Sequence, residues 1–200
     1  MTDFKILLMR HGEIDPAYKG RFIGQKDVGL SEKGKTQALS IRSIMAHTQV
    51  ESIFCSDLSR SHETAALISE GYNVTVKRMK NLREISLGEW EGMPIAEIKE
   101  RFPTQWRLRG ENIGEYRPTS GESFQDLARR VVPVFENIVQ SSTSNILIAG
   151  HAGLNRVIIC HILGIPLSNV LLIGQDYGRL SVLISRNGSI GVSTLNCALT

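Results

Sequence analysis

Residues 5–13, KILLMRHGE, place an Arg-His-Gly triplet directly after an apolar run of strand length. Residues 145–153, NILIAGHAG, repeat this design with a second histidine. A short apolar run that ends at glycine or polar residues is typical of a buried strand and the turn after it. We therefore expect strands at Lys5–Met9 and Asn145–Ala149, each leading into a histidine near its carboxyl end.

Along the rest of the chain, apolar runs of strand length alternate with amphipathic stretches of helix length, which is typical of α/β proteins. Further strands are expected at Ser52–Cys55, Val74–Val76, Leu180–Ile184 and Ile190–Thr194. Helices are expected at 31–47, from Ser59 to before Gly71, between Pro94 and Pro103, from Phe124 to about Ile138, and at Leu154–Leu163. The last two strands flank an Asn187-Gly188 turn that is typical of a hairpin. The predicted fold is a three-layer α/β/α sandwich with a mostly parallel central sheet and a C-terminal hairpin at its edge.

The composition, with 42% hydrophobic and 22% charged residues, excludes disordered, collagen-like and coiled-coil proteins. A chain of 200 residues fits one domain, and we expect residues 1–200 to form a single one. The segment Pro103–Ser120 has no periodicity and carries Arg107, Arg109 and Arg117. It predicts a long excursion from the sheet over the site, where these arginines either contact substrate or form a solvated loop face.

Charge and cysteine content restrict the partners and the compartment. The net charge of +3 is too small a surplus to indicate nucleic acid. Cys55, Cys160 and Cys197 form no CxxC pair and lie in or beside apolar runs, which predicts reduced core thiols. No signal peptide is expected at the start, and no apolar run approaches the roughly 18 residues that span a bilayer. We therefore expect a cytoplasmic protein without a membrane partner.

Four basic residues at predicted strand ends define the candidate site. Arg10 and His11 follow the first strand, and His151 follows the fourth. Arg60 lies in the first turn of the helix after the second strand. The alternative to a role in the site is that Arg60 is simply exposed to solvent there. Ligands of open α/β sheets gather at the carboxyl ends of parallel strands, so these side chains should converge. Paired guanidinium donors beside imidazoles suit a tetrahedral dianion, which predicts a pocket for a small phosphorylated metabolite. The other histidines, His47, His62 and His161, fall within helical patterns and are expected on helix surfaces or in the core.

Six motifs follow one another in order: LLMRHGE (7–13), GRFIGQKDVGLSEKGKTQA (20–38), CSDLSRSHETA (55–65), LREISLGEWEG (82–92), SGESFQDLARRV (120–131) and ILIAGHAG (146–153). Together they resemble the histidine phosphatase superfamily, in the branch that contains phosphoglycerate mutase and its small phosphatase relatives. The resemblance extends from Ile6 to about Leu183, and six ordered motifs are far more specific than the triplet RHG alone. It implies a phosphoglycerate mutase-like fold and a phosphatase activity. Because the strand-end motifs contain no acidic cluster, no metal and no other cofactor is expected.

The resemblance implies roles for five residues. His11 matches the nucleophile that becomes phosphorylated, and Glu84 matches the general acid of the phosphatase branch. The groups that hold the phosphoryl oxygens correspond to Arg10, Arg60 and His151. The residues expected to contact substrate are Arg10, His11, Arg21, Ile23, Gly24, Arg60, His151 and Ala152. A neutral imidazole can attack phosphorus, and the other ring nitrogen of His11 should donate to a backbone carbonyl that aims the ring.

Two positions depart from the family pattern. Ala17 stands where the family often has Asn, and Ile23 stands where a polar Thr or Gln usually precedes glycine. Two hydrogen bonds to phosphate are therefore absent or supplied by other groups, with Lys19, Arg21 and Gln25 as the nearby candidates.

Hydrolysis is favoured over two alternatives, a cofactor-dependent phosphoglycerate mutase and a non-catalytic protein that binds phosphorylated ligands. The mutase branch carries an aromatic and basic run after the acidic Glu, whereas this chain has Ile85-Ser86-Leu87-Gly88. The chain also stops at Thr200 without the mutase's longer insertion and tail. A binding-only relative would be expected to lose one of the five catalytic positions, yet all five match.

The substrate stays open among α-ribazole 5′-phosphate, sugar bisphosphates and the substrates of broad-specificity phosphatases. The segment GRFIGQKDVGLSEKG (20–34) is somewhat similar to that of α-ribazole phosphatases. Trp106 and Tyr116 in the excursion could cover a ring or an anionic sugar, or could simply anchor a surface loop. Either a monomer or a homodimer is expected.

Overall fold

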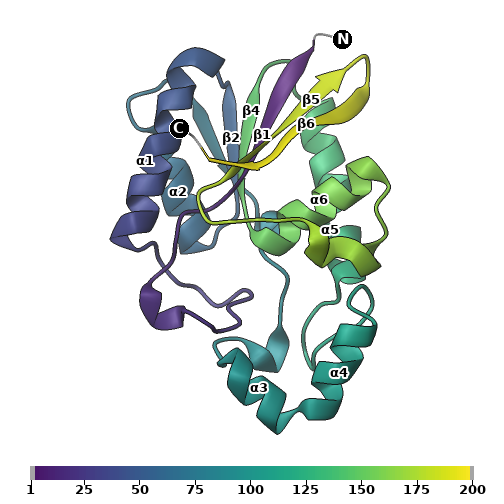
Figure 1. Ribbon diagram of the computed structural model, residues 1–200. Helices are drawn as coiled ribbons and strands as arrows, with labels where there is room; N and C mark the ends of the chain where they lie inside the picture. The colour runs from purple at the N-terminus through teal and green to yellow at the C-terminus, as the bar shows by residue number, and fades with distance from the viewer. Residues whose placement is uncertain (1–2, 199–200) are drawn as a thin grey trace.

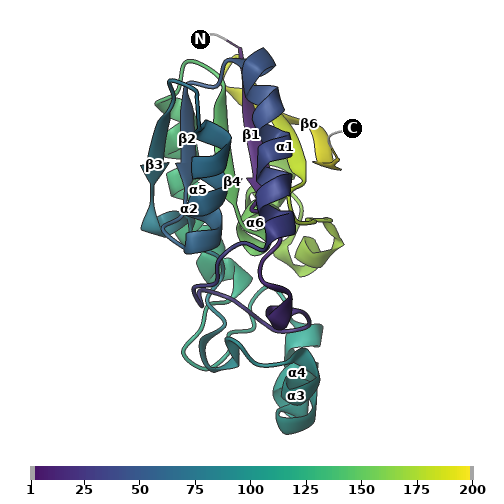
Figure 2. The same ribbon diagram turned by 90° about the vertical axis from the view of Figure 1, so that its left-hand side faces the viewer.

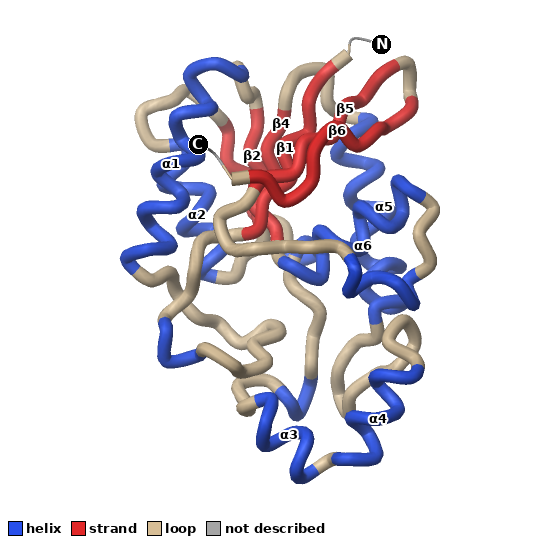
Figure 3. Tube along the Cα trace, viewed as in Figure 1, coloured by secondary structure: helices blue, strands red, loops and turns tan. Residues whose placement is uncertain are grey.

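The computed structural model describes residues 3–198, which build one six-stranded sheet (Figure 1; Figure 3). The strands are β1 (Phe4–Arg10), β2 (Ser52–Cys55), β3 (Thr75–Arg78), β4 (Ile146–Gly150), β5 (Leu180–Arg186) and β6 (Ser189–Cys197), in the order β3-β2-β4-β1-β5-β6. Strands β1 to β4 pair in parallel, whereas β5 and β6 are antiparallel. The expected mostly parallel sheet with a hairpin at its edge is confirmed.

Helices cover both faces of the sheet, and the alternation of side chains along β1 explains why. The helices are α1 (Glu32–Thr48), α2 (Ser59–Ser69), α3 (Ile95–Arg101), α4 (Pro103–Glu111), α5 (Phe124–Gln140) and α6 (Ala152–Leu163). Ile6 and Leu8 face the core that contains α5 and α6, whereas Leu7 and Met9 face the core that contains α1 and α2. Successive side chains of a strand point to opposite faces, so a continuous apolar run serves two cores at once. The three layers are visible in Figures 1 and 2.

Short 3-10 helices occupy four connections for which the sequence predicts no element. They are η1 (Pro16–Tyr18), η2 (Lys80–Leu82), η3 (Gly88–Trp90) and η4 (Leu167–Leu172). Helices this short lack the apolar stripe that marks an α-helix, so periodicity does not reveal them.

The segment 103–120 departs from the expected unstructured excursion, because residues 103–111 form α4. Figures 1 and 2 show α3 and α4 beyond the carboxyl ends of the strands, away from the sheet. No residue of α4 is buried, and therefore no apolar stripe marks it in the sequence. The helix instead has Pro103 in its first turn and an Arg107–Glu111 ion pair of 2.7 Å across one turn.

The expectation for the cysteines is partly wrong. Cys55 and Cys160 are buried free thiols, but Cys197 is exposed at the end of the edge strand β6. An edge strand has solvent on one side, so an apolar run there does not imply burial. Within residues 3–198, no helix is both long enough and apolar enough to cross a membrane.

Candidate active site

The carboxyl ends of β1, β2 and β4 bring the predicted basic residues together. In the sheet register Arg10 pairs with Gly150, and Cys55 pairs with Ala149. The residues that follow these pairs are therefore neighbours, and the rings of His11 and His151 lie 5.1 Å apart between centroids. The convergence predicted from the strand ends is confirmed, and both histidines are buried.

His11 is held with one defined nitrogen free. Its Nδ1 lies 2.7 Å from the carbonyl oxygen of Gly12. A carbonyl can only accept, so Nδ1 carries the proton and Nε2 keeps its lone pair. Burial, followed by the nearby charges of Arg60 and Arg10, lowers the pKa of His11 well below its usual value of 6.5. The ring is therefore neutral and nucleophilic at physiological pH, and the expected bond to a backbone carbonyl is confirmed.

His151 is positioned by a serine that sequence reasoning does not identify. The Nε2 atom of His151 lies 2.8 Å from Oγ of Ser56, and Ser56 Oγ also accepts from the backbone N–H of Leu58 at 3.3 Å. Burial and the neighbouring cations lower the pKa of His151 well below 6.5, so its ring is neutral. Among residues 3–198, Nε2 of His151 is the one acceptor in reach of the proton of this buried hydroxyl, so Ser56 donates to Nε2 and the proton of His151 lies on Nδ1.

The two central arginines are aimed by backbone carbonyls. Nη1 of Arg10 donates to Gln175 O at 2.7 Å, and its guanidinium carbon lies 3.5 Å from the ring centroid of Tyr177. Arg60, with only 2% of its surface exposed, donates from Nη1 to Lys26 O and from Nη2 to Gly24 O, at 2.8 and 2.7 Å. Neither guanidinium pairs with a carboxylate of residues 3–198. Their positive charge is therefore available to an anion.

Two buried nitrogen atoms at the centre of the site have no hydrogen-bond partner among the described residues: Nε of Arg10 and Nδ1 of His151. Both are donors in the protonation states derived above. A buried donor without an acceptor costs about 1–3 kcal/mol, so such groups mark the place of a missing ligand. An anion with several acceptor oxygens, bound next to His11, would satisfy both.

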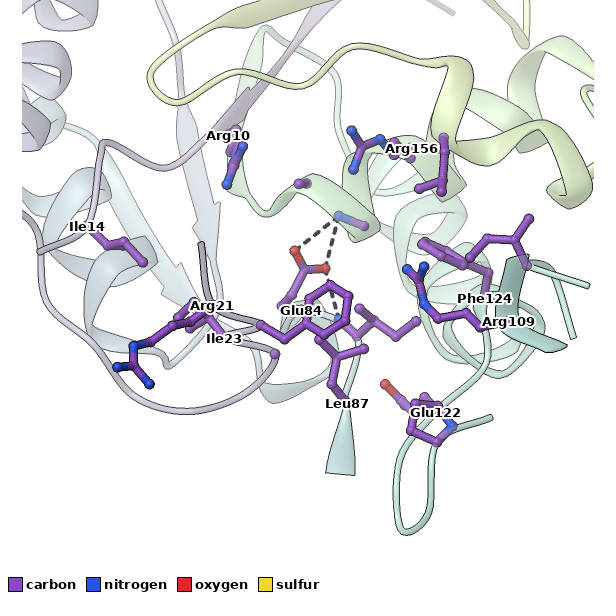
Figure 4. Close-up of a pocket in the computed structure, with 18 of the residues that line it drawn as sticks. Arg10, Ile14, Arg21, Ile23, Glu84, Leu87, Arg109, Glu122, Phe124 and Arg156 are labelled. Atoms are coloured by element: carbon purple, nitrogen blue, oxygen red, sulfur yellow. Dashed lines mark hydrogen bonds between the residues drawn. The ribbon is translucent and has the colours of Figure 1, made fainter. Parts of the chain in front are cut away.

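Glu84 faces the same space from the chain segment after η2. Its carboxylate accepts from the backbone N–H of Gly153 at 3.0 and 3.1 Å, of Leu154 at 3.3 Å, and of Ile85 at 2.9 Å (Figure 4). The first two groups belong to the first turn of α6, where the helix dipole also favours negative charge. A side chain at position 153 would place its Cβ 2.5 Å from the Glu84 carboxylate, so this contact requires glycine.

Arg130 fixes the backbone that carries Glu84. Its guanidinium donates to Asn81 O, Arg83 O and Glu84 O at 2.9–3.2 Å. The same guanidinium forms a two-pronged pair with the Glu122 carboxylate, at 2.7 and 2.8 Å. The segment before η3 is thereby tied to α5.

A cavity of about 290 Å³ opens at this edge of the sheet (Figure 4). Its lining includes every residue expected at the site except the fully buried His151. The predicted residues in the lining are Arg10, His11, Arg21, Ile23, Gly24, Arg60, Glu84 and Ala152. Arg109, Ile113 and Tyr116 of the excursion also line the cavity, whereas Arg107 and Arg117 do not.

The structure places the three candidates for the missing phosphate contacts, Lys19, Arg21 and Gln25, in different surroundings. Arg21 lines the cavity and donates to Gly92 O at 2.8 Å. Gln25 donates its amide to Glu84 O at 3.1 Å, so it supports Glu84. Lys19 is exposed and does not line the cavity.

Several residues that line the cavity or contact Arg10 carry no signal that local sequence could have provided. Tyr177 and Gln175 follow η4 in a loop without periodicity. Arg156 lies one turn after Gly153 on α6. Its short distance along the chain from His151 is the one feature of the sequence that could have indicated a place in the site. In the part of the chain that the structure describes, no cluster of three or more His, Cys, Asp or Glu residues could hold a metal ion.

The chain is similar over most of its length to characterised phosphatases. The sequence model of the Histidine phosphatase superfamily (branch 1) matches residues 6–198. Phosphoserine phosphatase 1 of Hydrogenobacter thermophilus is 30% identical over 180 residues, which cover 90% of this chain and 85% of that protein. The adenosylcobalamin/alpha-ribazole phosphatase of Salmonella typhimurium is 27% identical over 193 residues, or 96% of each chain.

A solved structure gives the same result for the fold. The mycobacterial glucosyl-3-phosphoglycerate phosphatase in complex with VO3 superimposes with a TM-score of 0.87 and 28% identity. The match covers 98% of this chain and 100% of that one.

Proposed function

The chain belongs to the histidine phosphatase superfamily, and from this premise we propose that His11 is the nucleophile with which it hydrolyses small phosphate monoesters. The observation that carries the assignment is the pair of unpartnered buried donors, Arg10 Nε and His151 Nδ1, beside the free Nε2 of His11. A phosphoryl group bound there would satisfy both donors and present its phosphorus to the imidazole.

In the first step, Nε2 of His11 attacks phosphorus, the N–P bond forms and the bond to the leaving oxygen breaks. Glu84, as the carboxylic acid, gives its proton to that oxygen. Arg10, Arg60 and the Nδ1–H of His151 neutralise the equatorial oxygens, where charge accumulates in phosphoryl transfer. The leaving alcohol departs from the side of the pocket on which Glu84 lies.

In the second step, a water molecule attacks the phosphohistidine. Glu84, now a carboxylate, takes a proton from the water, the N–P bond breaks, and inorganic phosphate leaves with His11 neutral again. Ser56 keeps the proton of His151 on Nδ1 throughout, so that this ring donates to phosphate oxygen in both steps.

Hydrolysis suits this pocket better than mutase action. The segment after Glu84 contributes apolar Ile85 and Leu87 to the cavity, and no basic side chain. Its backbone is tied down, because Ser86 N donates to Glu122 and Leu87 N donates to Glu91. In the mutase branch the segment after the acidic Glu carries a basic run that holds a second acidic group of the substrate, and here that segment supplies no basic side chain to the cavity, whose arginines come from other segments.

The relatives act on phosphoserine, α-ribazole phosphate and glucosyl-3-phosphoglycerate, by their names, and we propose a small phosphorylated metabolite of this kind as substrate. Further proposals are a single domain over residues 1–200, an activity independent of metal, a cytoplasmic location, a monomer or homodimer, and no nucleic-acid partner. Metal independence is supported by the absence of a metal-ligand cluster among residues 3–198.

The test is a comparison of wild-type protein with His11→Ala on a panel of alkyl and aryl phosphates. Wild type should turn over without added metal and after chelator treatment, and a quenched sample should carry one acid-labile phosphoryl group by intact mass. His11→Ala should lose several orders of magnitude in turnover on every substrate and carry no phosphoryl group. A loss restored only by a divalent ion would overturn metal independence. Rapid interconversion of 3-phosphoglycerate and 2-phosphoglycerate would favour the mutase instead.

A further inference from the structure

The loop 174–179 lies between η4 and β5 and crosses the carboxyl end of β1. The backbone N–H of Gly178 donates to the carbonyls of Arg10 and His11, at 3.2 and 3.1 Å. In return, the backbone N–H of Arg10 donates to Arg179 O at 3.2 Å. The loop is therefore attached to the two residues that begin the site, although none of its side chains takes part in the two steps of the proposed reaction.

Tyr177 of this loop packs its ring against both residues. The ring centroid lies 3.5 Å from the guanidinium carbon of Arg10 and 5.5 Å from the ring centroid of His11. A cation at 3.5 Å from the centroid lies on the face of the ring, where the aromatic quadrupole attracts it. Tyr177 also lines the cavity, so its ring forms the part of the wall next to the nucleophile.

The guanidinium of Arg10 depends on this ring because other groups restrain it little. Its Nη1 donates to Gln175 O at 2.7 Å, and no carboxylate of residues 3–198 pairs with it. One hydrogen bond leaves a planar guanidinium free to turn about that bond, whereas a ring stacked on its face fixes the plane. Figure 4 shows Arg10 reaching into the space that Glu84 faces, and its buried Nε has no partner among the described residues. The stacked ring therefore keeps this donor in place for an oxygen of the phosphoryl group.

The residues on either side of the loop hold Tyr177 in this position. On one side, Nδ2 of Asn155 in α6 donates to Oε1 of Gln175 at 2.8 Å, and both residues are buried. On the other side, Asn196 of β6 bonds twice to Asp176. Its Oδ1 accepts from the backbone N–H and its Nδ2 donates to the carboxylate, both at 2.8 Å. The residues next to Tyr177 are thus bound to two different elements, so the ring is in position before a ligand arrives.

We propose that Tyr177 is a positioning residue for phosphoryl transfer, whose ring clamps the guanidinium of Arg10 in the orientation that binds the transferred phosphoryl group. The inference rests on the proposed function, because that function places the phosphoryl group beside Arg10 and His11. Tyr177 acts through Arg10 and not on the reacting atoms. The clamp needs the aromatic face of Tyr177 and does not need its hydroxyl.

Binding of a tetrahedral anion tests the clamp without depending on turnover. Inorganic phosphate and orthovanadate are the probes, each titrated by calorimetry into wild type, Tyr177→Phe and Tyr177→Leu. Tyr177→Phe keeps the ring, so both affinities should stay within about twofold of wild type. Tyr177→Leu keeps an apolar side chain but lacks the aromatic face, so both affinities should fall about threefold to thirtyfold. A loss in Tyr177→Phe as large as that in Tyr177→Leu would refute the clamp, because the hydroxyl would then be the group that matters.

A double-mutant cycle tests whether Tyr177 acts through Arg10. In an Arg10→Gln background the ring has no guanidinium to hold, so Tyr177→Leu should change the orthovanadate affinity there by less than about twofold. A loss as large as that in the wild-type background would indicate a general structural effect and refute the clamp. Tyr72→Leu is the matched control, because Tyr72 is also half-buried but does not line the cavity, and it should retain the wild-type affinity. Thermal melts confirm that each variant is folded, and Tyr177→Met replaces Tyr177→Leu if the latter does not fold.

Turnover of phosphate monoesters separates this inference from the proposed function. We expect kcat/KM of Tyr177→Leu to fall by at least the factor lost in phosphate affinity, and that of Tyr177→Phe to stay near wild type. If wild type hydrolyses monoesters and Tyr177→Leu keeps both its kcat/KM and its phosphate affinity, the clamp is refuted while the phosphatase stands. If the double-mutant cycle shows the coupling to Arg10 but no monoester is hydrolysed, the clamp stands and the phosphatase fails.

Discussion

The proton on each buried histidine of the site is assigned by a single hydrogen bond. Nδ1–H of His11 donates to Gly12 O, and the Ser56 hydroxyl donates to Nε2 of His151. The free nitrogen is therefore Nε2 in His11 and Nδ1–H in His151. One ring therefore offers a lone pair and the other offers a proton. This pairing of nucleophile and donor depends on backbone and hydroxyl contacts, and within residues 3–198 no carboxylate bonds to either ring.

Ser56→Ala should change the tautomer of His151. Without the hydroxyl, nothing retains the lone pair on Nε2, and the Nε2–H form becomes accessible. Nitrogen-15 shifts of the His151 ring should show the proton on Nδ1 in wild type and a mixture in the variant. We expect kcat/KM to fall about tenfold, with the phosphohistidine still formed. An unchanged tautomer together with unchanged activity would contradict the role of Ser56.

Glu84→Gln should separate the two halves of the reaction. The variant keeps His11 but lacks the proton donor, so alkyl phosphates, which have poor leaving groups, should lose about 10²–10⁴-fold in rate. Nitrophenyl phosphate should lose less in the first step, because its leaving group departs without protonation. Since the second step also uses Glu84, phosphohistidine should accumulate with the activated ester and be detected by intact mass. Equal losses on both substrates, with no trapped intermediate, would indicate that Glu84 is structural.

At the scale of elements, the start of α1 and the chain after β1 touch through their backbones. A Cβ on Gly34 would lie 2.0 Å from Glu13 O, and a Cβ on Gly12 would lie 2.3 Å from Gly34 O. Ser31 supports the same junction, because its hydroxyl accepts from Gly34 N at 3.0 Å and its backbone N–H donates to Glu13 O at 2.9 Å. The helix thereby braces the turn that carries His11.

Gly34→Ala and Gly110→Ala should therefore have opposite effects on stability. Alanine normally stabilises a helix interior by about 0.5–1 kcal/mol relative to glycine. Gly110 in α4 has nothing within 4 Å of an added Cβ, so it should follow this rule. Gly34→Ala should instead destabilise by about 1–3 kcal/mol, because backbone must move, and should lower turnover through His11. Urea unfolding of both variants measures the difference, and a stabilised Gly34→Ala would contradict the contact.

At the scale of the whole molecule, burying neutral histidines couples stability to pH. His11 and His151 have pKa values well below 6.5 in the folded protein, because burial and nearby cations oppose their protonation. The unfolded chain binds these protons near pH 6.5. Its free energy therefore falls relative to that of the folded state as the pH decreases. The stabilising contribution is complete above pH 6.5 and is lost progressively below it.

The free energy of unfolding should accordingly decrease from pH 7.5 to pH 5, by up to about 1.4 kcal/mol per pH unit for each histidine. The paired Asp126, with a pKa of about 2, adds its loss only between about 3.8 and 2, outside this window. Urea unfolding at several pH values tests the slope. His11→Gln should reduce the slope, whereas the exposed His161→Gln should retain it. Stability that is flat or rises toward pH 5 would contradict neutral burial.

Much of the architecture could be predicted from the sequence, because it follows from local patterns. The apolar runs around Ile6 and Ile148 specify strands, and the residue that follows such a strand must lie at its carboxyl end, so His11 and His151 could be placed at one edge. The stripe of α5 has spacings of three and four residues, which only a helix brings to one side. The motifs around Arg60 and Glu84 then pointed to the same pocket.

Other features were decided by tertiary contacts alone. Ser56 and His151 are 95 residues apart, and only the pairing of β2 with β4 joins them. Arg107 pairs locally with Glu111 one turn along α4, whereas the pairing of Arg117 with Asp126 of α5 and the position of Arg109 at the cavity arise only in the folded chain. Charge alone does not specify a partner for Arg117, because its pair with Asp126 depends on the distance between two segments that meet only in the folded protein.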